Sequence, residues 1–112
     1  MRKWRHIYVD LYVVNIYWII CSLDWFKLKV KAEFNADLTD LDALDGRFQV
    51  FEKENQKVGV IWASTVSELA HEIFHCVVWM LNSRGLWLTE SSEEAYAYLI
   101  DFLDRKIRRG IS

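Results

Sequence analysis

Two histidines and a glutamate carry the clearest chemical signal in this chain. His71, Glu72 and His75 form the pattern His-Glu-x-x-His inside a segment with helical periodicity. Residues four apart on a helix share one face, with Cβ atoms about 5–6 Å apart, so two imidazoles at this spacing can bind one tetrahedral Zn²⁺. Glu72 then flanks the ion without binding it and can accept a proton from a zinc-bound water. The pattern predicts a zinc site with a general base beside it.

A catalytic zinc site usually has a third protein ligand, and the downstream acidic residues are the candidates. Glu90, Glu93 and Glu94 lie near the start of a second predicted helix, where the segment from Glu94 to Ala97 reads E-x-x-A. With these motifs, residues 58–105 resemble the gluzincin metallopeptidases, in particular the minimal gluzincin-type proteins of phages and mobile elements. The resemblance implies that Glu94 is the third ligand, with Glu93 as the alternative.

The same resemblance implies a function and a domain organisation. It implies that residues 1–112 form one zincin-like domain that hydrolyses a peptide bond with a zinc-activated water. His71, His75 and Glu94 would then bind Zn²⁺, and Glu72 would be the general base. Zincins bind substrate as an added strand at a sheet edge, which here would be residues 47–53. Tyr96 or Tyr98 are candidate oxyanion donors and Asp101 a candidate partner for a ligand imidazole, although packed or solvent-exposed roles explain these three residues as well.

Two alternatives use the same residues differently. The His-Glu-x-x-His pattern also occurs in helices that bind no metal, and Ser91-x-x-Glu94 also matches a helix capping box. The second alternative is a non-catalytic, zinc-containing binding protein, such as a phage or mobile-element factor that acts on a host protein. Replacing Glu72 by glutamine separates this alternative from the enzyme, because binding does not need a general base.

Composition narrows the class of protein. The chain has 112 residues, is 53% hydrophobic and carries a formal charge of −2, which predicts a folded domain without general attraction for nucleic acid or anionic membranes. The apolar run over residues 7–20 is interrupted by Asp10 and Asn15, so neither a signal peptide nor a membrane span is expected. Cys21 and Cys76 lack C-x-x-C spacing, which suits buried free thiols. We therefore expect a cytoplasmic protein with a peptide or protein as its substrate or partner.

The hydrophobic pattern predicts an α+β fold, with a small antiparallel sheet of three to four strands packed against two C-terminal helices that carry the metal site. Residues 7–20 are predicted to form one strand, buried on both faces at its end or bulged near Asn15. Alternation over residues 26–34 favours a second strand, although a helix there remains open. A loop over residues 36–46 precedes a hairpin of residues 47–53 and 58–63. A helix over residues 65–84 should begin at a Thr65-x-x-Glu68 capping box and end at Gly85. A second helix is predicted over residues 91–109.

Overall fold

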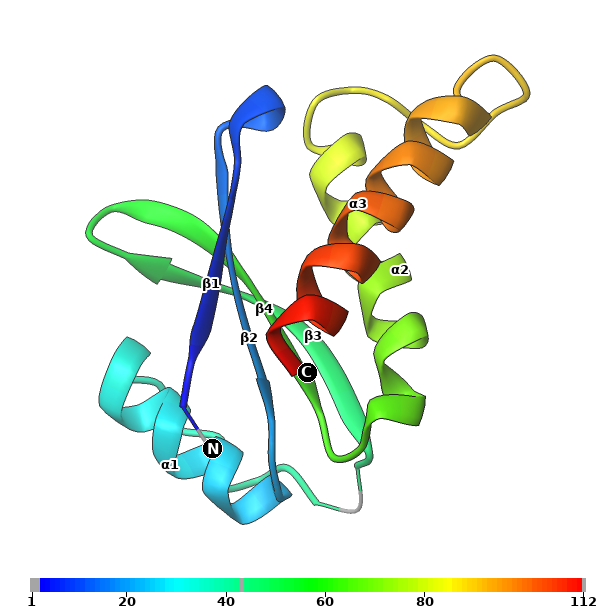
Figure 1. Cartoon of the computed structure of the whole chain (residues 1–112). Helices are drawn as coiled ribbons and strands as arrows, with labels where there is room; N and C mark the ends of the chain where they lie inside the picture. The colour runs from blue at the N-terminus through cyan, green and yellow to red at the C-terminus, as the bar shows by residue number, and fades with distance from the viewer. Residues whose placement is uncertain (1–2, 43, 112) are drawn as a thin grey trace.

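A computed structural model describes residues 3–42 and 44–111 of the chain. One four-stranded sheet lies between two helical layers, with α2 and α3 side by side on one face and α1 on the other (Figure 1). The predicted α+β class, with two C-terminal helices, is confirmed. In chain order the elements are β1 (Arg5–Val9), β2 (Val14–Ile20), α1 (Leu23–Phe34), β3 (Gly46–Lys53), β4 (Gln56–Ala63), α2 (Leu69–Asn82) and α3 (Glu93–Ile111).

The sheet is mixed, whereas the sequence predicted an antiparallel one. Its strand order is β1-β2-β4-β3. The β1–β2 and β3–β4 pairs are antiparallel, but β2 and β4 run parallel at the centre. A parallel pair needs a crossover connection, which α1 and β3 provide here. The predicted hairpin is confirmed, and its turn residues Glu54 and Asn55 both adopt positive φ angles, of 53° and 66°.

The single strand predicted over residues 7–20 is wrong, because the chain reverses in the middle of this run. Asp10–Tyr12 form a 3-10 turn, and Val13 follows with a φ of 53° in the left-handed region. The reversal produces the antiparallel β1–β2 hairpin. Each strand keeps its own alternating pattern, so alternation alone did not reveal the turn.

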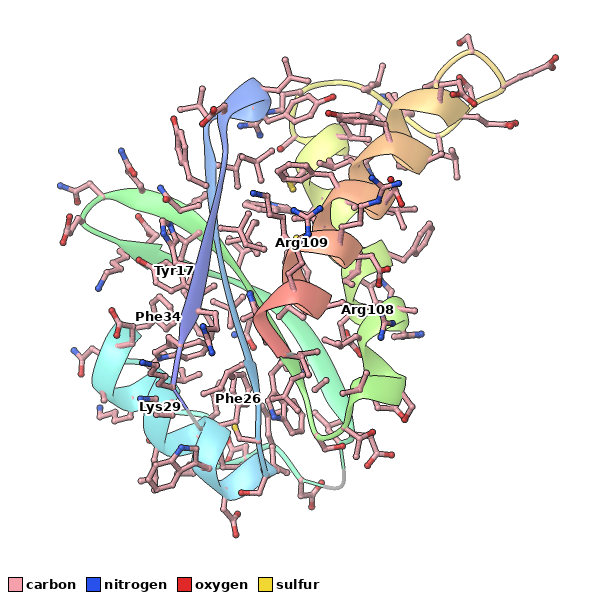
Figure 2. All side chains as sticks on the ribbon, in the orientation of Figure 1. Tyr17, Phe26, Lys29, Phe34, Arg108 and Arg109 are labelled. Atoms are coloured by element: carbon pink, nitrogen blue, oxygen red, sulfur yellow. The ribbon has the colours of Figure 1, made fainter. Side chains whose placement is uncertain are left out.

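The strand favoured for residues 26–34 is also wrong, because this segment is helix α1. The Ser22 hydroxyl accepts a hydrogen bond from the Trp25 N–H at 3.2 Å, and Asn35 ends the helix with a φ of 54°. Phe26 and Val30 lie one turn apart and are buried. Figure 2 shows Phe26 and Phe34 of α1 on the same side of the sheet as Tyr17. The alternation arose because the apolar stripe of this helix is narrow.

A pair of substitutions in α1 should have very different costs. Phe26 is 0% exposed and stacks on Trp62 with ring centroids 4.9 Å apart. Phe26→Ala should therefore lower the free energy of unfolding by about 3–5 kcal/mol. Leu28 is 62% exposed, so Leu28→Ala should stay within about 0.5 kcal/mol. Urea denaturation measures both. Equal costs would contradict the helix, because a strand places both side chains on one face.

The two C-terminal helices match their predicted positions closely. Thr65 precedes a 3-10 turn, Val66–Glu68, but its side chain makes no capping hydrogen bond, so the predicted capping box is not formed. Gly85 ends the α2 region as predicted, with a φ of 77°, and the Leu86 N–H donates to the Leu81 carbonyl at 2.9 Å. Within the described residues, the chain contains no helix with the length and apolar character needed to cross a membrane.

Candidate metal centre

The two histidines of the motif lie on the exposed side of α2, and their ring nitrogens converge. The Nε2 atoms of His71 and His75 are 3.1 Å apart. Two ligands at about 2.0–2.1 Å from a tetrahedral ion are separated by roughly 3.3 Å. The observed separation is close to that value. Imidazole nitrogens are also the commonest ligands for zinc in this setting, so the donor set fits a zinc ion.

Glu72 is the carboxylate that the fold brings to this pair. Its carboxylate oxygen and the two imidazole nitrogens all lie within 4.8 Å of one another. The side chain is only 6% exposed, and the backbone N–H of Phe48 in β3 lies near enough to its carboxyl group to lower the pKa of that group. This separation between the carboxylate and the imidazole nitrogens suits a general base that lies beside a bound ion. It also suits a carboxylate that moves slightly to bind the ion itself. Glu72 thus faces both the two histidines and the edge of the sheet.

The surroundings of Glu72 change its affinity for protons. Burial raises the pKa of the carboxyl group above its ordinary value, while the nearby His71 and His75 oppose the rise, as does the Phe48 backbone N–H. A raised carboxyl pKa brings the group closer to the range where a side chain both accepts and returns a proton near neutral pH. The position of Glu72 therefore suits acid–base chemistry.

Gly46 is a site residue that the sequence analysis missed. A Cβ atom at this position would lie 2.9 Å from Oε2 of Glu72, so the carboxylate rests directly against the bare backbone of β3. An isolated glycine in a strand often marks such a close approach, but the sequence pattern placed Gly46 at the end of the predicted loop over residues 36–46, so this signal was hidden. Gly46 allows α2 and β3 to approach at the point where Glu72 lies.

Replacing Gly46 by alanine should destabilise the protein through Glu72. We expect Gly46→Ala to cost about 1–3 kcal/mol of unfolding free energy, because the added methyl group crowds a buried carboxylate. The cost should be smaller in a Glu72→Ala background, with a coupling energy of about 0.5–3 kcal/mol between the two positions. Denaturation of the four chains in this double-mutant cycle measures the coupling. Purely additive costs would contradict the contact.

A shallow hollow connects the motif to β3, the edge strand beside it. Its lining includes both histidines, Glu72 and Trp79 of α2, together with Gly46 and Phe48 of β3. β3 is the last strand of the sheet and pairs only with β4 among the described residues. The segment expected to be the edge strand beside the motif is therefore confirmed as such. Its binding of a peptide remains a prediction.

The structure does not bring Glu94 to the histidines. The hydroxyl oxygen of Tyr96, in the first turn of α3, lies 2.8 Å from both the Asn82 Oδ1 atom and the Leu86 carbonyl oxygen, either of which can accept its single proton. Asn82 ends α2 about two turns beyond His75, which is roughly 10 Å along the axis. α3 begins at Glu93, so Glu93 and Glu94 lie at the far end of α2, outside the cluster of His71, Glu72 and His75.

The connection between the helices explains this separation. An extended run over residues 86–90 could lead back along α2, but the Leu86 N–H donates to the Leu81 carbonyl and turns the chain onto the end of α2. Ser92 then closes a compact loop, since its hydroxyl accepts from the Thr89 N–H at 2.8 Å and donates to the Trp87 carbonyl. The third-ligand role of Glu94 therefore stays a prediction without support from the geometry.

The remaining candidates lie elsewhere. The Tyr96 hydroxyl hydrogen-bonds at the end of α2, away from the histidines, and the Tyr98 side chain is exposed to solvent. Asp101 pairs with Arg105 at 3.2 Å on the surface of α3. His6, the third histidine, lies with its Nε2 atom 2.5 Å from Oδ1 of Asn15.

Both cysteines are buried, as expected, and no disulfide joins them. Burial raises the pKa of the Cys76 thiol. Cys76 lies in the core and outside the cluster of His71, Glu72 and His75, so it is a packing group of α2.

Comparisons with known proteins identified no relative of this chain. No protein-family model matches the chain, and no match was found to a curated protein or to a solved structure. The fold and the geometry around His71, Glu72 and His75 are therefore the basis for assigning a function.

Proposed function

We propose that this protein is a zinc-dependent, peptidase-like hydrolase of the zincin type. The observation that carries the proposal is the convergence of His71, His75 and Glu72 beside the edge strand β3. His71 and His75 would hold the ion through their Nε2 atoms. A bound Zn²⁺ would lower the pKa of a coordinated water and polarise a carbonyl group.

Glu72 would move the protons of the reaction. Its carboxylate would accept a proton from the attacking water and pass it to the leaving amine. The carboxylate lies against the backbone of β3 at Gly46, which would place it beside a peptide lying along that strand. The outward main-chain groups of β3 would hold an extended peptide as an added strand. Binding and proton transfer would thus take place at one edge of the sheet.

One observation favours the non-catalytic alternative as well. The carboxylate of Glu72 already packs against β3 and is almost fully buried, which is also what a contact that ties α2 to the sheet would need. In this alternative a metal at the histidines would stabilise a binding domain, as metals do in small domains. A cytoplasmic host protein would then be a partner instead of a substrate.

Metal removal tests the proposal directly. The zinc-loaded chain is incubated with a mixture of unstructured peptides, and mass spectrometry detects new peptide termini. We expect cleavage that a chelator abolishes and added Zn²⁺ restores. Peptides that stay intact with the zinc-loaded chain, or cleavage that persists in chelator, would contradict the enzyme.

A further inference from the structure

The sheet has a second open edge, far from the metal centre in strand order. β1 lies at the margin opposite β3 and pairs only with β2 among the described residues. An edge strand presents a row of unpaired N–H and C=O groups that can pair with another chain. β1 therefore offers main-chain hydrogen bonds.

A stripe along α3 forms the opposite wall of a groove next to this edge. Tyr98, Phe102, Lys106 and Gly110 follow at four-residue spacing, which places them on one side of the helix. One hollow lies between residues 8–12 and the Tyr98–Phe102 end of the stripe, and a second lies between residues 3–7 and Gly110. Lys106 lines both hollows, and we refer to the two hollows together as the β1 groove.

The two ends of this groove differ in character. The end next to residues 3–7 carries Lys3, Arg5 and Lys106, and no aspartate or glutamate among the described residues lines this hollow. The other end carries exposed aromatic and apolar side chains, with Tyr98 64% and Leu11 73% exposed. The cations come from opposite ends of the sequence, and only the fold brings them together.

We propose that this groove binds an extended segment of a partner protein as a fifth strand, antiparallel to β1. Antiparallel addition places the C-terminal end of the segment at the basic end of the groove. The segment should therefore carry carboxylates near its C-terminal end and aromatic or apolar side chains near its N-terminal end. Main-chain pairing supplies affinity, and the α3 stripe selects the side chains. This surface is separate from the edge at β3 and does not depend on the proposed hydrolysis.

A designed peptide tests this proposal. The probe is a blocked nine-residue peptide of alternating valine and threonine, with a tyrosine near its N-terminal end and two glutamates near its C-terminal end. Added to the full chain, it should shift the amide NMR signals of residues 5–9 and of the α3 stripe, and leave those of β3 unchanged. Raised salt and replacement of the glutamates by lysine should each weaken binding, since exposed charges are screened.

Matched variants locate the binding. Arg5→Glu combined with Lys106→Glu should weaken binding roughly tenfold or more, while Arg108→Glu, on the same helix but outside both hollows, should not. N-methylation of alternate peptide nitrogens should abolish binding if main-chain pairing holds the segment. Shifts at β3 instead of β1, equal affinity for the lysine peptide, or self-association of the chain through β1 in sedimentation would each overturn the proposal.

Discussion

Glu72→Gln should reduce peptide hydrolysis at least about 100-fold, in line with the usual contribution of a positioned acid–base group. Glutamine has nearly the same volume as glutamate and keeps an oxygen that can face the Phe48 N–H. It cannot accept a proton from water at neutral pH. The variant should therefore retain its fold and its zinc while losing the reaction. Cleavage rate, thermal unfolding and zinc content, measured on one preparation, check all three expectations.

Glu68→Gln provides the control for this experiment. Glu68 lies one turn before Glu72, close enough to raise the pKa of the Glu72 carboxyl by charge repulsion, but it lies outside the cluster. Its replacement makes the same chemical change nearby and should leave the cleavage rate within a few-fold of the parent rate. Unchanged hydrolysis in Glu72→Gln would reject Glu72 as the general base of the reaction.

Zinc should stabilise the folded chain strongly, and His71→Ala should remove this effect. A ligand that binds only the folded state at a thousand times its dissociation constant adds about 4 kcal/mol to the free energy of unfolding. The melting temperature of the parent chain should therefore rise when zinc replaces chelator. His71→Ala loses one of the two converging nitrogens, so its melting temperature should respond little.

His6→Ala is the matched control for the zinc response. His6 is the one histidine outside the motif, and its ring contacts Asn15 and Tyr17. Its replacement should leave the zinc-induced rise in melting temperature intact. An equal response in His71→Ala and the parent would show that zinc acts elsewhere on the chain.

Features that depend on local spacing could be predicted from the sequence. His71 and His75 converge because four residues make about one helical turn. Gly85 ends α2 because it adopts a positive φ angle at low cost. The hairpin of β3 and β4 follows from two apolar runs around polar turn residues.

The sequence did not predict the structure of segments whose residues fit both a strand and a helix. Residues 26–34 fit a strand by alternation, but Ser22 and Asn35 cap a helix there. Lys27, Lys29 and Lys31 can lie on different sides of the helix at no cost in stability, because α1 buries only the narrow stripe of Phe26 and Val30. Burial against the sheet thus decided the structure, and alternation did not.

The position of Glu94 shows a different limit. The E-x-x-A pattern identifies a helix face, but the connection before it decides whether that face reaches the histidines. The bonds of Leu86 and Ser92 fold the connection onto the end of α2, and no spacing rule contains these contacts. Gly46 and Phe48 were missed for a related reason, since they reach Glu72 only after the sheet has formed.

The zinc content of the purified chain, compared with that of His75→Ala and Glu94→Ala, tests the central claim most directly. We predict about one zinc per parent chain, its loss in His75→Ala and its retention in Glu94→Ala. Of these two residues, only His75 belongs to the cluster of His71, Glu72 and His75. Loss of zinc in Glu94→Ala would restore the third-ligand role implied by the gluzincin resemblance and contradict the arrangement of α3. A parent chain that takes up no zinc, or His75→Ala that keeps it, would contradict the metal centre itself.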